Sequence, residues 1–276
     1  MMIRPHPHSL VAVSTAVWRR CCSGIHFVRL MTQCSRNGSV HSSLEEDLKG
    51  ADEEQRELMG EQVILVSPCD EVQGFASKAE AHHISSGLLL HRAFSVFLFD
   101  SHRRLLLQQR AGTKITFPLY WTNTCCSHPL YSIKEELSSD GVKHAAKRKL
   151  YQELGISPEA LSVEDFRYLT RIHYRAMSDS IWGEHEIDYI LFVVKDVELN
   201  PCKNEVEAVH YIDMEQLQSW LSQAKSNSSQ IRLTPWFTFI AEHFLFDWWK
   251  QLETDQLFQV TDKDHIYRAS HSLFQA

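Results

Sequence analysis

The chain has 276 residues, of which 43% are hydrophobic and 23% are charged. This is enough to bury one substantial core, so one main folded domain is expected. The net charge of -7 argues against a general nucleic-acid binder, whose affinity depends on concentrated Lys and Arg. No apolar run reaches the roughly 20 residues that cross a bilayer, so no membrane-spanning helix is expected. The seven cysteines lack paired or zinc-type spacing, which favours reduced thiols in an intracellular compartment.

Residues 1–52 are predicted to be a disordered leader. No acidic residue precedes Glu45, and five arginines stand among Ser, Thr, Ala and Val, as is typical of a mitochondrial transit peptide. A leader without an address is the alternative interpretation. The last residues do not match the peroxisomal tripeptide. The folded domain is expected to cover residues 53–276.

Hydrophobic periodicity predicts strands and helices in alternation along the folded domain. Asp140 and Gly155 are expected to cap a central amphipathic helix, and Thr234 with Pro235 to begin the last helix, which runs through Trp249. The result is a mixed α/β sandwich. The expected strands are 62–66, 91–99, 105–110, 166–173, 187–194 and 206–212, with 91–99 and 105–110 as a hairpin, and the other helices are 141–154 and 214–223.

Two carboxylates, Glu184 and Glu186, alternate just before the apolar run 190–194, which is typical of a buried strand. Alternate strand residues share a face. Like charges on one buried face are costly unless a cation or a proton offsets them. This segment is therefore a candidate for binding an ion or a substrate.

Imidazoles complete a candidate metal site. His82 or the adjacent His83, together with His91 and His128, would join the two carboxylates in a set of nitrogen and oxygen donors. Such donors suit a divalent ion such as Zn, Mn or Mg. With 16 histidines in the chain, any single one is more often a surface or structural residue.

Cys126 lies two residues before His128. If a metal occupies His128, that imidazole cannot also act as the general base of the thiol, so a protease-like Cys-His pair is disfavoured. The thiol is then better interpreted as a proton donor or acceptor, with Glu186 on the opposite side of the substrate. An inert buried thiol is the alternative.

Cations and a helix end point to an anionic ligand. Lys78, Arg110 and Lys114 could reach an anionic group, although each could also be an ordinary solvated cation. The segment 148–156 resembles the helix motif of diphosphate-cleaving Nudix enzymes, but Lys149 and Gln152 replace two of its three metal-binding glutamates. A hydrolase that needs several metals would be crippled, whereas Glu153 could still hold one Mg on a diphosphate.

Taken together, four segments resemble type I isopentenyl-diphosphate isomerase, a Nudix-fold family. The resemblance covers residues 61–268 and implies a Nudix-type α/β/α sandwich with a mixed β-sheet. It also implies interconversion of isopentenyl and dimethylallyl diphosphate in isoprenoid and sterol biosynthesis, by protonation and deprotonation through a carbocation. The segments are Gly-Leu-Leu-Leu-His-Arg-Ala-Phe-Ser (87–95), Thr-Asn-Thr-Cys-Cys-Ser-His-Pro (122–129), Trp-Gly-Glu-His-Glu-Ile-Asp-Tyr (182–189) and Thr-Pro-Trp (234–236).

The resemblance also implies roles for individual residues. The catalytic pair would be Cys126 and Glu186, assisted by Tyr174, and Trp121 and Trp236 could shelter the carbocation by cation–π attraction or simply pack in the core. The implied metal ligands are His82 in preference to His83, His91, His128, Glu184 and Glu186, with a second Mg on Glu153, and the implied diphosphate contacts are Lys78, Arg110, Lys114 and Ser127.

The expected partner is a small prenyl diphosphate, with no nucleic acid and no membrane, and the expected state is a monomer. The family resemblance favours the cytosol or the peroxisome, whereas the leader favours the mitochondrion. Two other functions remain as alternatives: a Nudix diphosphohydrolase, and an inactive binding protein that keeps the fold.

Overall fold

A computed structural model describes residues 44–226 and 230–269. The predictions for the leader before residue 44 and for the C-terminal tripeptide lie outside these residues. The described part begins ahead of residue 53, where the folded domain was expected to start. Leu44 is buried there in a small cluster with Met59, Ala79 and Trp182.

Within the described residues, ten strands form one mixed sheet. The central strand is β3, which runs parallel to β8 and antiparallel to β6 and β4, and all nine of its residues are buried. The order along the sheet is β10-β7-β8-β3-β1-β2, while β4 joins β3 to β5 and β9. The strands are β1 (Gln62–Val66), β2 (Val72–Ser77), β3 (His91–Phe99), β4 (Leu105–Arg110), β5 (Trp121–Thr122), β6 (Cys125–Ser127), β7 (Arg167–Met177), β8 (Gly183–Val194), β9 (Val206–Ile212) and β10 (Ile266–Arg268).

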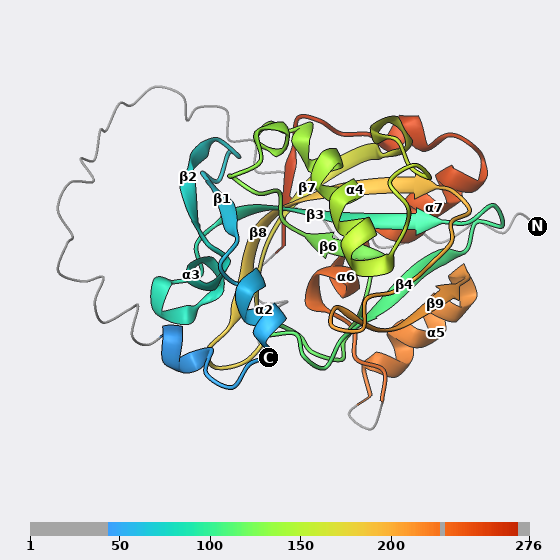
Figure 1. The fold of residues 1–276 in the computed structure, drawn as a ribbon. Coiled ribbons are helices and arrows are strands. Elements are labelled where there is room, and N and C mark those ends of the chain that lie inside the picture. The colour runs from blue at the N-terminus through green and yellow to red at the C-terminus, as the bar shows by residue number, and fades with distance from the viewer. Residues whose placement is uncertain (1–43, 227–229, 270–276) are drawn as a thin grey trace, which may run out of the picture. The chain divides into compact units, whose positions relative to one another are not determined.

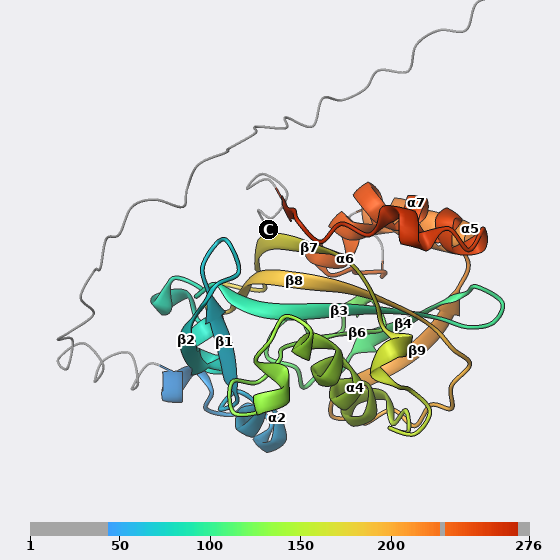
Figure 2. The ribbon, with the colours of Figure 1, turned by 90° about the horizontal axis from the view of Figure 1, so that it is seen from above.

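Helices cover both faces of this sheet, as Figures 1 and 2 show. One face packs against α4 through Val142, Ala146 and Leu150, and the other packs against α5, α6 and α7. The predicted α/β sandwich is confirmed. The helices are α2 (Glu53–Leu58), α3 (Lys78–His82), α4 (Gly141–Leu154), α5 (Met214–Ala224), α6 (Pro235–Ile240) and α7 (Phe246–Glu253), with short 3-10 turns at Ile84–Ser86, Lys134–Glu136, Val163–Asp165 and Leu257–Val260. No helix in the described ranges is both long and apolar enough to cross a membrane.

Most predicted elements are confirmed, and those at 62–66, 91–99, 105–110, 141–154 and 206–212 have the predicted bounds. Asp140 and Gly155 cap α4, and Thr234 precedes Pro235 at the start of α6, as predicted, but neither N-cap side chain caps its helix by a hydrogen bond. Asp140 has a helical backbone conformation, and its side chain makes no capping hydrogen bond. The side chain of Thr234 makes none either, since its hydroxyl lies 2.8 Å from that of Thr122. The last helix begins at Pro235 and runs through Trp249 as predicted, with a π-helical segment (Ala241–Leu245) between α6 and α7.

Candidate active site

Five buried side chains from four parts of the chain converge on the α6 face of the sheet. His82 ends α3, His91 begins β3, His128 follows β6, and Glu184 and Glu186 lie on β8. In the parallel pairing of β3 with β8, His91 lies opposite Glu186. One ligand atom from each of the five lies within 4.8 Å of all the others. The structure therefore brings the predicted metal-binding residues together.

The contacts within this cluster are close. His82 Nε2 lies 2.6 Å from Glu184 Oε2, and His128 Nε2 lies 2.8 Å from Glu186 Oε1. His91 Nε2 lies 3.4 Å from the same Glu186 oxygen.

Backbone carbonyls fix the orientation of two of the imidazoles. Nδ1 of His82 lies 2.7 Å from the carbonyl oxygen of Lys78, and Nδ1 of His91 lies 2.7 Å from that of Leu89. A carbonyl can only accept, so each Nδ1 carries a proton, and each Nε2 is the ring nitrogen turned toward the cluster. This is the arrangement in which proteins prepare a histidine as a metal ligand.

Three of the converging atoms have close neighbours in the cluster but form no hydrogen bond of acceptable geometry among the described residues. His82 Nε2, His91 Nε2 and Glu184 Oε2 are buried without a hydrogen bond of acceptable geometry. Burial, with His91 and His82 nearby, lowers the pKa of His128 far below its ordinary value, so this ring is neutral. Buried polar atoms without partners are costly. A divalent cation would satisfy these atoms, and the nitrogen and oxygen donors suit Zn, Mn or Mg.

His83 does not belong to this cluster. Its Nε2 lies 2.9 Å from Asp47 Oδ2, its Nδ1 lies 2.7 Å from Ser85 Oγ, and its ring packs edge-on against Trp182. Of the two adjacent histidines, the geometry places only His82 among the candidate ligands.

Tyr174 extends the cluster toward a pocket. It lies opposite Glu186 in the antiparallel pairing of β7 with β8, and its hydroxyl donates a hydrogen bond of 2.5 Å to Glu186 Oε2. Burial and the neighbouring Glu186 raise the pKa of Tyr174 well above its ordinary value. Although burial alone would raise the pKa of Glu186, the contacts with His91 and Tyr174 lower it. Glu186 is therefore ionised, and Tyr174 is its hydrogen-bond donor.

The two adjacent cysteines point to opposite sides of β6. Cys126 lies opposite Ser95 of β3 and lines the pocket, whereas Cys125 faces α4, with its sulfur 3.5 Å from Glu153 Oε2. Burial raises the pKa of Cys126 to about 12, even though the guanidinium of Arg110, 3.8 Å from the sulfur, opposes this. At neutral pH, Cys126 is thus a thiol in the pocket rather than a thiolate.

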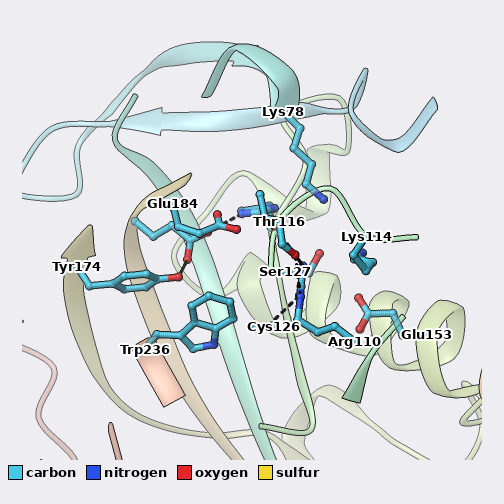
Figure 3. Close-up of a pocket in the computed structure, with 12 residues that line it drawn as sticks. Lys78, Arg110, Lys114, Thr116, Cys126, Ser127, Glu153, Tyr174, Glu184 and Trp236 are labelled. Atoms are coloured by element: carbon cyan, nitrogen blue, oxygen red, sulfur yellow. Dashed lines mark hydrogen bonds and ion pairs between the residues drawn. The ribbon is translucent and has the colours of Figure 1, made fainter. Parts of the chain in front are cut away.

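Figure 3 shows that the pocket has two chemically different ends. Tyr174, Glu184 and Trp236 lie at one end, and Trp236 stacks on Tyr174 with ring centroids 5.8 Å apart. A cationic end faces them, with Cys126 between the two. It contains Lys78, Arg110 and Lys114, and Ser127 and Glu153 also line the pocket. The structure therefore brings the predicted diphosphate contacts together.

The cationic end is held by specific contacts. Arg110 donates hydrogen bonds to the carbonyl oxygen of Thr116, and its guanidinium lies 5.9 Å from the ring centroid of Trp236. Burial, followed by repulsion from Lys114, lowers the pKa of Lys78 to about 8.

Glu153 of α4 contacts two neighbouring side chains. Its Oε2 accepts a hydrogen bond of 3.0 Å from Gln108, and its Oε1 lies 3.4 Å from the buried ammonium of Lys149. Lys149, whose ammonium faces Glu153, occupies a position at which the Nudix motif has a metal-binding glutamate.

Trp121 was predicted either to shelter the carbocation or to pack in the core. Trp121 is not among the residues that line the pocket, and its ring packs against Trp220 with centroids 5.1 Å apart. The interpretation as a packing residue describes it better.

Two residues near the pocket were not singled out from the sequence. Asp188 lies on the same face of β8 as Glu184 and Glu186, and it accepts a hydrogen bond of 2.8 Å from Ser95. Burial and the nearby Glu186 raise the pKa of Asp188 well above its ordinary value. The three alternating acids were a signal for it. Thr116 lies in a loop, where spacing gives no such signal.

Comparisons with known proteins find one matching domain family and a set of similar enzymes. A model of the NUDIX domain matches residues 89–237. Isopentenyl-diphosphate Delta-isomerase 1 of Bos taurus is 51% identical over 219 residues, which cover 78% of this chain and 95% of the relative. Isopentenyl-diphosphate Delta-isomerase II of Clarkia breweri is 47% identical over 225 residues, and the chloroplastic isopentenyl-diphosphate Delta-isomerase II of Arabidopsis thaliana is 46% identical over 225 residues; each match covers 79% of both chains. Among solved structures, the Deinococcus radiodurans protein DR0079 matches with a TM-score of 0.45 and 18% identity, over 67% of this chain and 100% of that one.

Proposed function

We infer that this chain, which belongs to the NUDIX family and within it to the isopentenyl-diphosphate Delta-isomerases, interconverts isopentenyl and dimethylallyl diphosphate by moving protons. One observation carries the mechanism: the thiol of Cys126 and the carboxylate of Glu186 line the same pocket, whose other end is cationic. This arrangement supports a five-carbon group held between an acid and a base while its diphosphate binds the cations.

The reaction needs one proton added and another removed. Protonation of the terminal CH₂ of isopentenyl diphosphate creates a tertiary carbocation at C3. Loss of a proton from C2, the neighbouring carbon on the diphosphate side, then forms the new double bond between C2 and C3. Cys126 and Glu186 serve as the two groups on opposite faces of the substrate, so that one delivers a proton and the other removes one. Tyr174 holds Glu186 in place through its 2.5 Å hydrogen bond. No oxidant or reductant is required.

The carbocation must be kept from water until the second proton leaves. Trp236 is 2% exposed and stacks on Tyr174 beside Glu186, so its π face can stabilise the positive charge. A desolvated cation–π contact contributes about 2 kcal/mol or more. Asn123 accepts a hydrogen bond of 3.2 Å from the indole nitrogen of Trp236 and so limits rotation of the ring.

Two metal sites fit the residues present. The first consists of the three imidazoles of His82, His91 and His128 with Glu184 and Glu186, and would hold Zn, Mn or Mg. A bound divalent cation would supply positive charge that favours the ionised form of Glu186. The second is Glu153, which would hold a Mg ion that offsets the charge of the diphosphate.

We place this activity in isoprenoid and sterol biosynthesis and expect the enzyme to act as a monomer. The arginine-rich leader favours the mitochondrion, and the family resemblance favours the cytosol or the peroxisome. Fluorescent fusions with and without residues 1–43 would distinguish these compartments.

The direct test uses the full-length protein with isopentenyl diphosphate and Mg in deuterated water. We expect dimethylallyl diphosphate that carries deuterium, and we expect its formation to stop after treatment with a chelator. A phosphate-release assay on the same samples tests for hydrolysis. Release of phosphate without deuterated dimethylallyl product would favour a NUDIX hydrolase and contradict the proposal.

A further inference from the structure

Lys114, at the cationic end of the pocket, has a buried anionic partner. Its ammonium lies 2.7 Å from Glu205 Oε2, and the two side chains are only 8% and 4% exposed. Lys114 belongs to the loop after β4, and Glu205 immediately precedes β9. Glu205 does not line the pocket itself, so it contacts Lys114 from behind.

A helix near the start of the described chain fixes the other oxygen of Glu205. Gln55 of α2 is 3% exposed, and its amide nitrogen donates a hydrogen bond of 2.8 Å to Glu205 Oε1. The same amide lies 2.6 Å from Asn204 Oδ1, and Asn204 in turn donates to Asp52, the N-cap of α2. Both carboxylate oxygens of Glu205 are therefore committed, one to Lys114 and one to Gln55.

The charge around Glu205 favours its ionised form. Burial alone would raise the pKa of Glu205, but the ammonium groups of Lys114, Lys149 and Lys78 lower it. A buried ammonium without such a partner either loses its proton or moves to solvent. A lysine that must meet a diphosphate needs to remain charged and correctly aimed before the substrate arrives.

We propose that Glu205 is a positioning residue for the diphosphate: it holds the Lys114 ammonium at the pocket, and Gln55 of α2 holds Glu205 in turn. This inference rests on the proposed contact between Lys114 and the diphosphate. The matched NUDIX domain covers residues 89–237, so α2 lies outside it. The proposal therefore gives α2 an indirect part in substrate binding. Lys114 lines the pocket and Glu205 does not. The ion pair can therefore affect ligand binding through the position of Lys114, in addition to stabilising the fold.

The test is a double-mutant cycle on the full-length protein, with calorimetric binding of inorganic pyrophosphate in the presence of Mg as the readout. Residues that orient metal ligands typically contribute about 10- to 100-fold to affinity, and we expect Glu205→Gln to weaken pyrophosphate binding by at least about tenfold. Lys114→Met should weaken it at least as much. If Glu205 acts through Lys114, adding Glu205→Gln to Lys114→Met should change affinity by less than about twofold.

The outcomes separate this inference from the proposed function. Wild-type affinity in Glu205→Gln, or a full additional loss in the double variant, would overturn the positioning role. Wild-type affinity in Lys114→Met would instead refute the contact between Lys114 and the diphosphate, whereas a failure of the wild type to form dimethylallyl diphosphate would refute the proposed function.

Three further variants separate a positioning role from a general loss of stability. Asp70→Asn also breaks a buried ion pair, since the side chain of Asp70 is 3% exposed and binds Arg92 and Arg171. It should lower the melting temperature but leave pyrophosphate affinity unchanged. Gln55→Met keeps the side-chain volume and removes the hydrogen bond to Glu205, so it should weaken pyrophosphate binding by about two- to fivefold. This variant tests the proposal even if Glu205→Gln does not fold. Glu205→Asp should restore part of the affinity that Glu205→Gln loses. Unchanged affinity in Gln55→Met would remove α2 from the inference.

Discussion

Tyr174→Phe should lower the kcat of the isomerase without weakening its binding of the diphosphate. The substitution removes the 2.5 Å hydrogen bond to Glu186 Oε2 and keeps the aromatic ring that stacks on Trp236. A hydrogen bond to a charged group contributes about 1.5–3 kcal/mol. If that energy is lost from the transition state, kcat should fall about 10- to 150-fold, because each 1.36 kcal/mol is a factor of ten. KM should stay nearly constant, since Tyr174 lies at the opposite end of the pocket from Lys114.

The pH dependence gives a second readout of the same change. The hydrogen bond from Tyr174 helps to lower the pKa of Glu186, so its loss should raise that pKa. As the pH falls, the carboxylate would then be protonated at a higher pH than in the wild type, so the acid limb of the kcat/KM profile should move to higher pH. The assay is the initial rate of dimethylallyl diphosphate formation from pH 5 to pH 9.

Tyr189→Phe is a matched control on the opposite face of the sheet. The hydroxyl of Tyr189 also donates to a buried carboxylate, that of Asp70, but its side chain packs on the α4 side. This variant should lose stability while its kcat stays near that of the wild type. If both variants slow the reaction equally, or if Tyr174→Phe keeps full kcat, the positioning of Glu186 by Tyr174 is refuted.

Three other predictions test the remaining parts of the site. Cys126→Ala should lower turnover by about 10²- to 10⁴-fold, whereas Cys125→Ala, on the other side of β6, should retain far more activity; equal rates in the two variants would contradict the assignment. Because the pKa of Lys78 is about 8, its ammonium is present below that pH and lost above it, so calorimetric affinity for Mg-pyrophosphate should fall above pH 8 in the wild type and stay flatter in Lys78→Arg. Chelation should lower the melting temperature, and metal restored to about 100 times its Kd should return about 2.7 kcal/mol of stability, an effect that Glu184→Gln should weaken in differential scanning calorimetry.

The elements with a long or strongly periodic pattern could be predicted from the sequence. The helix 141–154 has apolar residues at helical spacing, and β8 shows alternating acids followed by an apolar run. The five-residue helix α3 is too short for periodicity, and it is held by a capping box between Ser77 and Glu80. Without that helix, the choice between His82 and His83 depended on resemblance alone, whereas the structure separates the two rings clearly.

The site was predictable where neighbouring residues in sequence share a face, and less so where distant segments meet. The spacing of Cys126 and His128, and of Glu184 and Glu186, indicated which side chains act together. The ion pair between Lys114 and Glu205 joins residues 91 positions apart, so no local pattern contains it. The sequence left Trp121 open between a cation–π contact and core packing, and the two-residue strand β5 directs its ring toward Trp220.

The alternation of side chains along β3, β6 and β8 makes the active site sensitive to the number of residues in each of these strands. Slipping a strand by one position exchanges every inward residue for an outward one. Such a slip in β6 would present Cys125 in place of Cys126, and in β8 it would present His185 in place of Glu184 or Glu186. Single-residue insertions and deletions in these strands should therefore be far more harmful than conservative substitutions, and natural length variation should be confined to the connecting loops.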